Sequence, residues 1–385
     1  MSNYDKNIFI LTAGSEVLTA NRKGGSFMIN QASILSSLGY HVKFISVGFH
    51  SLSHLFKNKR YPSEEKINGF TIYRSYINWY FIQRLSPFGI KLFFQRKLLK
   101  KLFLDLKLRG ELPDLIISHY TFYSGILASE ISKEFNIPFI IQEHSSDFMN
   151  YGVSKIRIKM IKKLLSDQTI YCVSQKFANE LSKLLEVKCS SFPNAINQIY
   201  EEKLPTKFSG KNIIVIGNLI PIKNIFDIIK AFKLAKISKE VNLKIFGKGP
   251  LEIKIMDLIK NDPDLNNRVK IVPYAPPKQL REELLNSLCL LHGAKYETFG
   301  VALVEALFCG SRVITTDVGI ASELINNRNG VIVSNTDEMA TALEKYCNNI
   351  LSLKERIEIS NEAKKKFGIE AYSNNIIKLI NKNLN

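Results

Sequence analysis

Short apolar runs recur along the chain, separated by segments in which apolar residues repeat with helical spacing. The runs are rich in Ile, Val and Phe and are bounded by Gly, Pro, Asn or Ser, a composition typical of buried strands. In the first half they occupy residues 7–13, 40–47, 114–120, 138–144 and 168–174. Helical periodicity over 24–39, closed by Gly39, connects the first two. Strands that alternate with helices predict a parallel sheet of the α/β class.

A polar stretch with proline and glycine, residues 203–212, interrupts this pattern and has the composition of a linker. The pattern then restarts with apolar runs at 213–219, 241–249, 269–275, 288–294 and 311–317. A length of 385 residues also exceeds what one hydrophobic core usually organises. We therefore predict two Rossmann-like domains, 1–205 and 206–365, that face a cleft at the carboxyl ends of their sheets. A C-terminal helix, 366–385, is expected to pack back on the first domain.

Two glutamates interrupt the apolar stretch ETFGVALVEALFCGSRVITT, residues 297–316. The pattern predicts a helix that begins near Thr298, its N-cap, and ends at Cys309. Glu297 then lies at the helix mouth, and Glu305 lies among apolar neighbours, where an unpaired carboxylate is costly. The first peptide N–H groups would form an anion site suited to a diphosphate, namely those of Phe299, Gly300 and Val301. The alternative is structural: a first-turn carboxylate favoured by the helix dipole and a solvated helix residue.

Two further loops follow predicted strands of the second domain. Lys223 ends the loop VIGNLIPIKN, 215–224, where a lysine can meet phosphate, although a surface lysine is the ordinary alternative. The loop FGKGPLEIKI, 246–255, carries Gly249 after a strand. Glu252 occupies the last glycine position of GxGxxG, so the match to a dinucleotide-binding loop is only partial.

Together these segments resemble the retaining glycosyltransferases of family four, whose two-domain fold is called GT-B. The motifs that carry the resemblance are ETFGVALVE, GNLIPIK, GKGP, FPNAIN, KGGSFMINQ and QEHSSDF, and they extend over nearly the whole chain. The resemblance implies transfer of a sugar from a nucleotide-diphosphate-sugar donor, with retention of configuration. It implies no obligatory cofactor and no metal, and it favours a UDP-sugar over a GDP-sugar.

The resemblance also implies roles for single residues. The catalytic pair would be His144, near the reacting carbon, and Glu297, which would hold hydroxyls of the transferred sugar. Glu305 would hold the ribose, and Lys223 would neutralise the diphosphate. The other donor-binding positions are Gly25, Asn218, Gly249, Thr298, Phe299, Gly300 and Val301, with Asn218 standing where the family has an arginine. A core histidine at a strand end is the alternative for His144.

The formal net charge of +18 favours an anionic partner. Residues 79–109 alone contain eight Lys or Arg and one acidic residue. From Lys91 onward, apolar side chains can share one helical face, namely Leu92, Phe93, Leu99, Phe103 and Leu106. Between them stand cations that we assign to a membrane or an acceptor: Arg96, Lys97, Lys100 and Lys101. A basic amphipathic helix suits an anionic membrane; the alternative is a core-facing helix with a solvated basic rim. Residues 154–165 are a smaller candidate of the same kind.

Other features narrow the class of protein. Five scattered cysteines without a CxxC pair argue against a zinc ribbon and favour reduced thiols. We predict neither a signal peptide nor a transmembrane helix. No helix-turn-helix, finger or RNP signature occurs, so we expect no nucleic-acid partner.

The predicted function is therefore a hexosyltransferase that acts on a glycan or a lipid-linked glycan. We expect it in the bacterial cytoplasm, peripheral at the inner face of the membrane, in envelope polysaccharide synthesis such as that of capsule or O-antigen. The rival is a nucleotide-sugar epimerase of the same fold, which needs no second substrate. The basic amphipathic stretch favours transfer.

Overall fold

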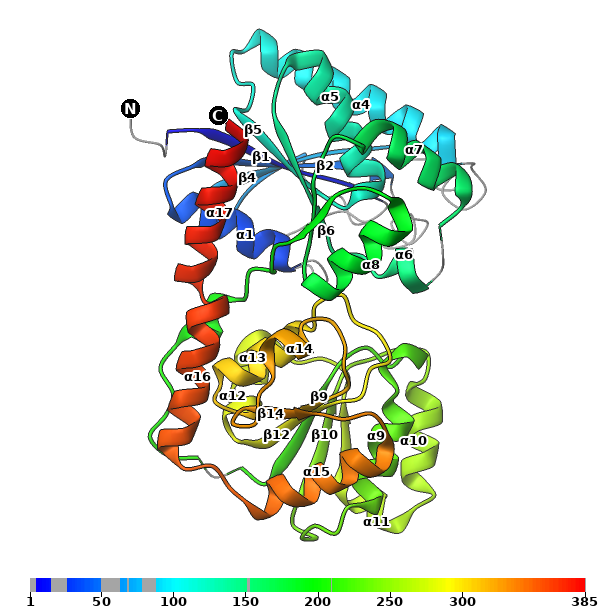
Figure 1. Ribbon diagram of the computed structural model, residues 1–385, viewed down its shortest axis with the longest axis vertical. Coiled ribbons are helices and arrows are strands. Elements are labelled where there is room, and N and C mark those ends of the chain that lie inside the picture. The colour runs from blue at the N-terminus through cyan, green and yellow to red at the C-terminus, as the bar shows by residue number, and fades with distance from the viewer. Residues whose placement is uncertain are drawn as a thin grey trace. The chain divides into compact units, whose positions relative to one another are not determined.

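The computed structural model describes residues 5–14, 26–49, 63–67, 69–77, 88–150, 153–208 and 210–384. The chain divides into two compact units (Figure 1). The first contains the residues up to Ala195 together with those from Tyr372 onward, and the second is Ile196–Ala371. The polar segment 203–212 therefore belongs to the second unit.

The first unit is built on a sheet with the strand order β3-β4-β2-β1-β5-β6-β7-β8. Neighbouring strands are parallel, except that β3 and β4 are antiparallel. The strands are β1 (Asn7–Gly14), β2 (His41–Phe49), β3 (Glu64–Ile67), β4 (Phe70–Ile77), β5 (Leu115–His119), β6 (Phe139–Glu143), β7 (Ile170–Cys172) and β8 (Cys189–Ser191). Both β5 and β6 are buried along their whole length, which explains their uninterrupted apolar runs.

The helices of the first unit follow its strands in the chain. They are α1 (Ser26–Ser37), α4 (Phe88–Leu108), the π-helical turn η1 (Thr121–Gly125), α5 (Ile126–Phe135), α6 (Asp147–Asn150), α7 (Lys155–Leu165) and α8 (Gln175–Leu185). The last helix, α17 (Ile369–Leu384), enters this unit at Tyr372. Gln31 of α1 donates from Nε2 to the Tyr372 hydroxyl at 2.7 Å, and Phe192 meets the Tyr372 ring edge-on at 5.5 Å. These contacts confirm that the C-terminal helix packs on the N-terminal part of the chain.

The second unit contains a wholly parallel sheet with the strand order β11-β10-β9-β12-β13-β14. Counted from β9, this is the 3-2-1-4-5-6 order of the Rossmann fold. The strands are β9 (Asn212–Ile216), β10 (Asn242–Phe246), β11 (Val269–Val272), β12 (Ser287–His292), β13 (Arg312–Thr315) and β14 (Gly330–Ile332). The parallel sheets confirm the predicted α/β class.

Helices cover both faces of this second sheet (Figure 1). They are α9 (Ile225–Leu234), α10 (Glu252–Lys260), α11 (Pro263–Arg268), α12 (Pro277–Leu285), α13 (Val301–Phe308), α14 (Ala321–Leu324), α15 (Thr336–Asn348) and α16 (Leu353–Phe367), with short 3₁₀ turns η2 (Gln198–Glu201) and η3 (Pro221–Lys223). Apolar side chains of α9, α10 and α15 form one continuous core with the strands.

Each sheet has a point at its centre where the order of the strands reverses. It lies between β1 and β5 in the first unit and between β9 and β12 in the second. Ligands of such sheets bind outside the carboxyl ends of the strands at these points. The loops after β9 and β12, and the residues that end β5 and β6, are therefore the places to look for a site.

Candidate functional site

The loops after β9 and β12 meet at the reversal point of the second sheet. The peptide N–H of Lys295 donates to the Ile222 carbonyl at 2.8 Å, which joins the two loops. Next to this bond, Lys223 Nζ forms an ion pair with Glu297 Oε1, and the two side chains are only 18% and 19% exposed. The structure thus brings together two residues that the sequence singles out separately.

A third residue, His292, completes this cluster, although the sequence analysis does not single it out. It is the last residue of β12 and is 4% exposed. Its Nε2 lies 3.1 Å from Glu297 Oε1, and its Nδ1 lies 3.4 Å from the Thr315 hydroxyl at the end of β13. The sequence does contain a signal for His292, because a titratable side chain stands there at the carboxyl end of a strand, shortly before the candidate carboxylate Glu297. We call Lys223, His292 and Glu297 the charged cluster.

The charged cluster keeps Glu297 ionised. Burial by itself raises the pKa of Glu297, but the hydrogen bond from His292 and the charge of Lys223 together lower this pKa to about 2. An ionised carboxylate is only an acceptor of hydrogen bonds. Glu297 is therefore suited to hold the hydroxyl groups of a ligand.

The helix after Glu297 begins later than the sequence predicts. Helix α13 starts at Val301, its N-cap is Gly300 at φ 93°, and no side chain caps it. The assignment of Thr298 as N-cap is therefore wrong. The cause is the glycine, whose left-handed backbone reverses the chain immediately before the first helical residue. Phe299 is buried, and its carbonyl accepts from the N–H of Ile320 at 2.8 Å, which fixes the turn.

Glu305, on α13, has an environment opposite to that of Glu297. Burial raises the pKa of Glu305 to about 8, although the Tyr200 hydroxyl nearby acts in the other direction. At neutral pH this carboxyl group is therefore largely protonated in the free protein. The two glutamates of one motif thus carry different charges.

The remaining predicted positions of the second unit lie in the loops after β9 and β10. Asn218 is exposed in the first of these loops. Gly249 lies against it, because a Cβ atom at this position would be 2.4 Å from the Leu219 carbonyl oxygen. Only glycine permits this approach, so Gly249 holds the two loops together. Gly25, the predicted position in the first domain, lies outside the described residues.

In the first unit, His144 follows β6 and is held on both ring nitrogens. Its Nδ1 lies 2.8 Å from Asn194 Oδ1, and its Nε2 lies 2.8 Å from Nδ1 of His119, the last residue of β5. The Phe27 ring stacks on His144 at 4.2 Å. The sequence analysis does not assign His119 or Asn194 to the site. We call His119, His144 and Asn194 the neutral cluster.

Both imidazoles of the neutral cluster are uncharged near neutral pH. Burial lowers the pKa of His144 to about 3, although the bond with Asn194 opposes this shift. Burial, and then the charge of His144, lower the pKa of His119 well below its usual value. The buried Glu143 fixes the backbone here, since its Oε1 accepts from the N–H groups of His144 at 2.8 Å and Ser145 at 2.7 Å.

Helix α4 carries the cations that the sequence assigns to a membrane, but its apolar face packs in the core. Four of the five apolar residues predicted to share a face are buried: Leu92, Leu99, Phe103 and Leu106. The assignment of that face to a membrane is therefore wrong, because core and membrane helices have the same apolar spacing. Phe93 points outward and is 45% exposed. The part of the basic stretch at 79–87 lies outside the described residues.

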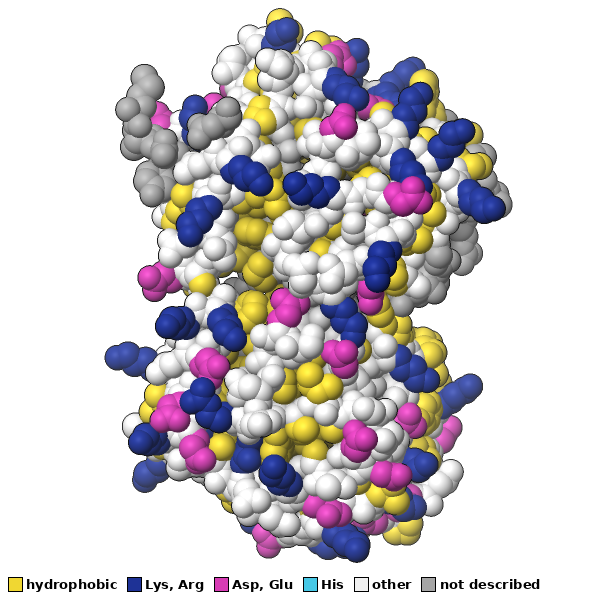
Figure 2. Space-filling model, viewed as in Figure 1, with side chains coloured by type: hydrophobic (Ala, Val, Ile, Leu, Met, Phe, Trp, Pro, Cys, Tyr) yellow, Lys and Arg dark blue, Asp and Glu magenta, His cyan; other side chains and the backbone are white. Residues whose placement is uncertain are grey.

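The four assigned cations of α4 have different surroundings. Arg96 and Lys100 form ion pairs with Glu130 and Glu134 of α5, at 2.6 and 2.7 Å. Lys97 Nζ lies 4.6 Å from the centre of the Phe93 ring, and Lys101 is exposed. On the face shown in Figure 2, basic side chains are scattered over both units.

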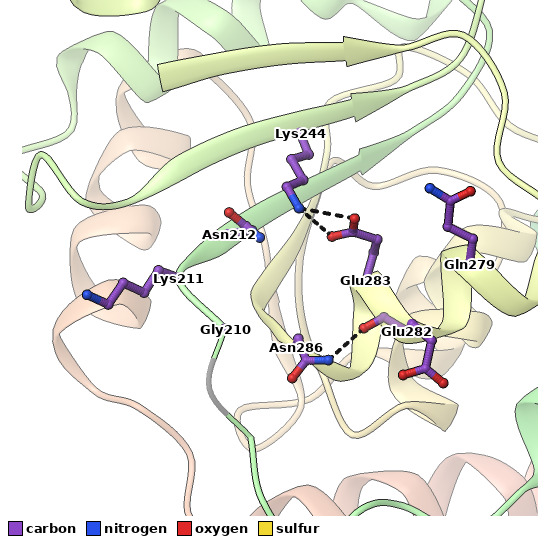
Figure 3. Close-up of a pocket in the computed structure, with 8 residues that line it drawn as sticks. All are labelled: Gly210, Lys211, Asn212, Lys244, Gln279, Glu282, Glu283 and Asn286. Carbon is purple, nitrogen blue, oxygen red and sulfur yellow. Dashed lines mark hydrogen bonds and ion pairs between the residues drawn. The ribbon is translucent and has the colours of Figure 1, made fainter. Parts of the chain in front are cut away.

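A cavity of about 400 Å³ lies beside the start of β9 and is lined by residues of β10 and α12 as well (Figure 3). Its lining residues are Gly210, Lys211, Asn212, Lys244, Gln279, Glu282, Glu283 and Asn286. Lys244 Nζ is bound by both carboxylate oxygens of Glu283, at 3.1 and 2.8 Å, and Lys211 pairs with Glu240. These lysines are therefore already neutralised within the unit.

Within the described ranges, no group of three or more His, Cys, Asp or Glu side chains is arranged to hold a metal ion. None of the helices in those ranges combines the length and the apolar composition that a membrane crossing requires.

Known proteins resemble the chain in both sequence and fold. Residues 197–366 match the family profile described as Glycosyl transferases group 1. TuaC of Bacillus subtilis, named as a glycosyltransferase of teichuronic acid biosynthesis, is 25% identical over 346 residues, 84% of each chain. The phosphatidylinositol N-acetylglucosaminyltransferase GPI3 subunit of Saccharomyces cerevisiae is 27% identical over 228 residues, 54% of this chain. The chain spans about half of the length of GPI3, since the match covers 50% of it.

Solved structures share the whole architecture. Sucrose-phosphate synthase from Thermosynechococcus elongatus has a TM-score of 0.76 at 17% identity and covers 98% of both chains. HepE of Anabaena, solved in complex with UDP, has a TM-score of 0.68 at 14% identity and covers 98% of this chain and all (100%) of its own. Residues 197–366 therefore match a group 1 glycosyltransferase domain, and the chain has the fold of these structures, with the two Rossmann-like domains of the GT-B type.

Proposed function

We propose that this protein is a glycosyltransferase that transfers a hexose, with retention of configuration, from a nucleotide-diphosphate sugar to a glycan or lipid-linked glycan. A UDP-sugar is the favoured donor, which agrees with the UDP complex of HepE. Synthesis of an envelope polysaccharide, such as a capsule or O-antigen, agrees with the naming of TuaC as a glycosyltransferase of teichuronic acid biosynthesis. The observation that carries the proposal is the charged cluster at the reversal point of the second sheet.

Different residues of the charged cluster can bind the two ends of a donor. Lys223 is a flexible cation and meets the diphosphate, while Glu297 accepts hydrogen bonds from hydroxyls of the transferred sugar. In the free protein these opposite charges neutralise each other. Because a bound diphosphate supplies a new partner for Lys223, the charge of Glu297 becomes available to the sugar.

Departure of the nucleotide leaves negative charge on the diphosphate. Lys223 and the peptide N–H groups near Phe299, Gly300 and Val301 are the groups that stabilise this charge, with Asn218 and Gly249 in the neighbouring loops. Thr298 belongs to the same turn. Glu305 accepts from the ribose, and the loop at Gly25 approaches the diphosphate. His144 acts beside the reacting carbon.

In this proposal the first unit binds the acceptor. The protein is bound peripherally to the inner face of the cytoplasmic membrane. Four apolar side chains of α4 are exposed: Ile90 at 41%, Phe93 at 45%, Leu104 at 44% and Leu108 at 88%. Lys97 and Lys101 are exposed on the same helix. Apolar and basic side chains that share an exposed surface favour an anionic membrane. These six residues, from Ile90 to Leu108, are the α4 outer surface.

Two measurements test the donor and the reaction. The first is the shift in the midpoint of thermal unfolding with UDP-, GDP-, ADP- and TDP-sugars, each with and without magnesium. We expect stabilisation by a UDP-sugar whether or not magnesium is present. The second is the product formed from that donor after long incubation with membranes that contain glycolipids. Release of UDP supports transfer, a changed sugar still attached to UDP supports the epimerase, and no stabilisation by any donor contradicts the proposed site.

A further inference from the structure

The buried ring of His119 contains a polar atom that the fold does not satisfy. His119 is 1% exposed, and its Nδ1 is bonded to His144. Among the described residues, nothing hydrogen-bonds to its other nitrogen, Nε2. Leaving a buried polar group unpaired costs about 1–3 kcal/mol. An apolar side chain would avoid this cost, so the bond from Nδ1 to His144 is the feature that a histidine adds here.

The next residue, Tyr120, holds a strained backbone. Its φ of 74° and ψ of 130° lie outside the regions that non-glycine residues favour. Its N–H donates to the Gln142 carbonyl at 2.7 Å, and its ring meets the His144 ring at 5.8 Å. Such strain costs about 1–3 kcal/mol and is concentrated at functional sites. The unpaired nitrogen of His119 and the strained backbone of Tyr120 are therefore two separate energetic costs, and both residues contact the His144 ring.

The hydrogen bonds of the neutral cluster determine which nitrogen of each ring carries the proton. Asn194 Oδ1 is an acceptor, so His144 donates to it from Nδ1–H. Nε2 of the neutral His144 ring then has only a lone pair, and it accepts from Nδ1–H of His119. The chain of bonds ends at the unprotonated Nε2 of His119.

We propose that His119 is a positioning residue for His144, whose ring it holds in one tautomer and one orientation at the carboxyl end of β6. This inference rests on the proposed function, which places His144 beside the reacting carbon. His119 ends β5, which borders the reversal point of the first sheet. A change at His119 therefore alters the form in which His144 meets the donor, without removing a group that binds the nucleotide.

Three variants of the full chain separate this role from simple filling of space. In asparagine the amide nitrogen is attached to Cγ, as Nδ1 is in histidine, so His119→Asn keeps the donor to His144. In glutamine the amide lies one bond farther out, at the position of Nε2, so His119→Gln loses this donor but remains polar. His119→Phe keeps the ring and loses both nitrogens.

The rate of UDP release from UDP-glucose and UDP-N-acetylglucosamine is the first readout. We expect His119→Asn to stay close to the wild-type kcat, and His119→Gln and His119→Phe to fall at least about tenfold, with KM for the donor unchanged. The second readout is the ¹⁵N spectrum of the histidine rings, in which His144 should be protonated on Nδ1 alone in the wild type and in His119→Asn. It should become a mixture of tautomers in the other two variants.

Equal behaviour of His119→Asn and His119→Gln, in rate and in tautomer, would overturn the proposal. Midpoints of thermal unfolding identify any variant that is merely unfolded, and the Asn and Gln pair decides the matter if the Phe variant does not fold. If the wild type releases no UDP from either donor, the proposed function has failed for those donors. The ring spectrum still tests His119 in that case, because it requires no turnover.

Discussion

The carboxyl ends of the two sheets have opposite electrostatic environments, although the parallel strands around the reversal point follow the same order in both units. In the second unit, Lys223 and Glu297 form an ion pair, and the pKa of Glu297 falls to about 2. In the first unit, His119 and His144 are joined ring to ring, and the pKa of His144 falls to about 3. One cluster preserves charge near neutral pH, and the other excludes it.

The difference follows from the partners that each fold provides. Burial disfavours the ionised form of Glu297 and of His144 alike. For Glu297 a histidine and a lysine outweigh burial, whereas the hydrogen bonds of the His144 ring to a neutral amide and a second imidazole do not outweigh it. The second unit can therefore balance the charge of a diphosphate donor, and the first unit can supply a rigid, uncharged surface.

The largest effect that we predict is the loss of charge at Glu297. Glu297→Gln keeps the size of the side chain but removes the carboxylate that faces Lys223 and His292. We expect kcat for UDP release to fall on the order of a hundredfold, because the interaction serves the reacting sugar. Glu358→Gln, on an exposed site of α16, is the matched control and should leave the rate unchanged. Equal rates in both variants would remove Glu297 from the reaction.

Loss of Lys223 should have the next largest effect, and chiefly on donor binding. Lys223→Met leaves the half-buried Glu297 with His292 as its remaining partner and removes a cation from the diphosphate. We expect KM for a UDP-sugar to rise about tenfold or more, because the variant lacks the cation that faces the diphosphate and a hydrogen bond between charged groups contributes about 1.5–3 kcal/mol.

The control for Lys223 is Lys295→Met, a change at an exposed lysine in the loop after β12. It removes the same charge from the same end of the sheet. If both variants raise KM equally, the effect comes from the general field of the unit and not from the charged cluster.

Glu305 should have a smaller effect that depends on pH. As the pH rises, its contribution to the stability of the free protein should fall, whereas its contribution to donor binding should grow. Its pKa of about 8 exceeds that of an unfolded glutamate, so the folded state binds the extra proton. The contribution of Glu305 to the free energy of unfolding should therefore fall as the pH rises from about 5 to 8. Ribose hydroxyls donate to a carboxylate, so donor binding should tighten over the upper part of the same range.

Urea unfolding and donor titration at several pH values, each compared between the wild type and Glu305→Gln, check both signs. The neutral cluster acts on stability with the opposite sign, because burial lowers the pKa of His144 to about 3, so its contribution to the free energy of unfolding rises with pH up to about 6.5. The difference between the wild type and Glu305→Gln therefore isolates the contribution of Glu305, and donor binding in the variant should lose its dependence on pH. If donor binding in Glu305→Gln retains the wild-type dependence on pH, Glu305 does not hold the ribose.

Much of the fold follows from local sequence pattern, because buried parallel strands and their connecting helices differ in periodicity. Three of the strands that escaped prediction are short or polar, namely β3 (Glu64–Ile67), β8 (Cys189–Ser191) and β14 (Gly330–Ile332), and the longer β4 (Phe70–Ile77) was missed as well. They are strands because a neighbouring strand pairs with them. A pairing partner distant in the sequence is not visible in a local pattern.

Prediction of the site residues from the sequence is limited in the same way. Lys223 and Glu297 were predictable because each lies in a loop between a strand and a helix, where ligands bind. His292, His119 and Asn194 owe their positions to the register between strands, which no single segment specifies. The N-cap of α13 was misplaced because the φ of Gly300 decides where the helix starts. The face of α4 was misassigned because its amphipathic spacing does not distinguish a protein core from a membrane.

The last prediction concerns membrane binding and compares the surfaces of the two units. The α4 outer surface should bind vesicles that contain phosphatidylglycerol, and the double change Lys97→Gln with Lys101→Gln should weaken this binding. Each lysine near an anionic surface contributes about 1 kcal/mol, so we expect a loss of about fivefold for each, measured by co-sedimentation.

The second unit offers a matched control on α10, where Ile253 is 73% and Met256 39% exposed beside the exposed Lys254 and Lys260. Lys254→Gln with Lys260→Gln removes the same charge from a similar mixture of side chains, and we expect it to leave vesicle binding nearly unchanged. If both double variants lose affinity equally, binding follows net charge alone. Because the α4 apolar face lies in the core, such a result would exclude the α4 outer surface as the surface that orients the protein on a membrane.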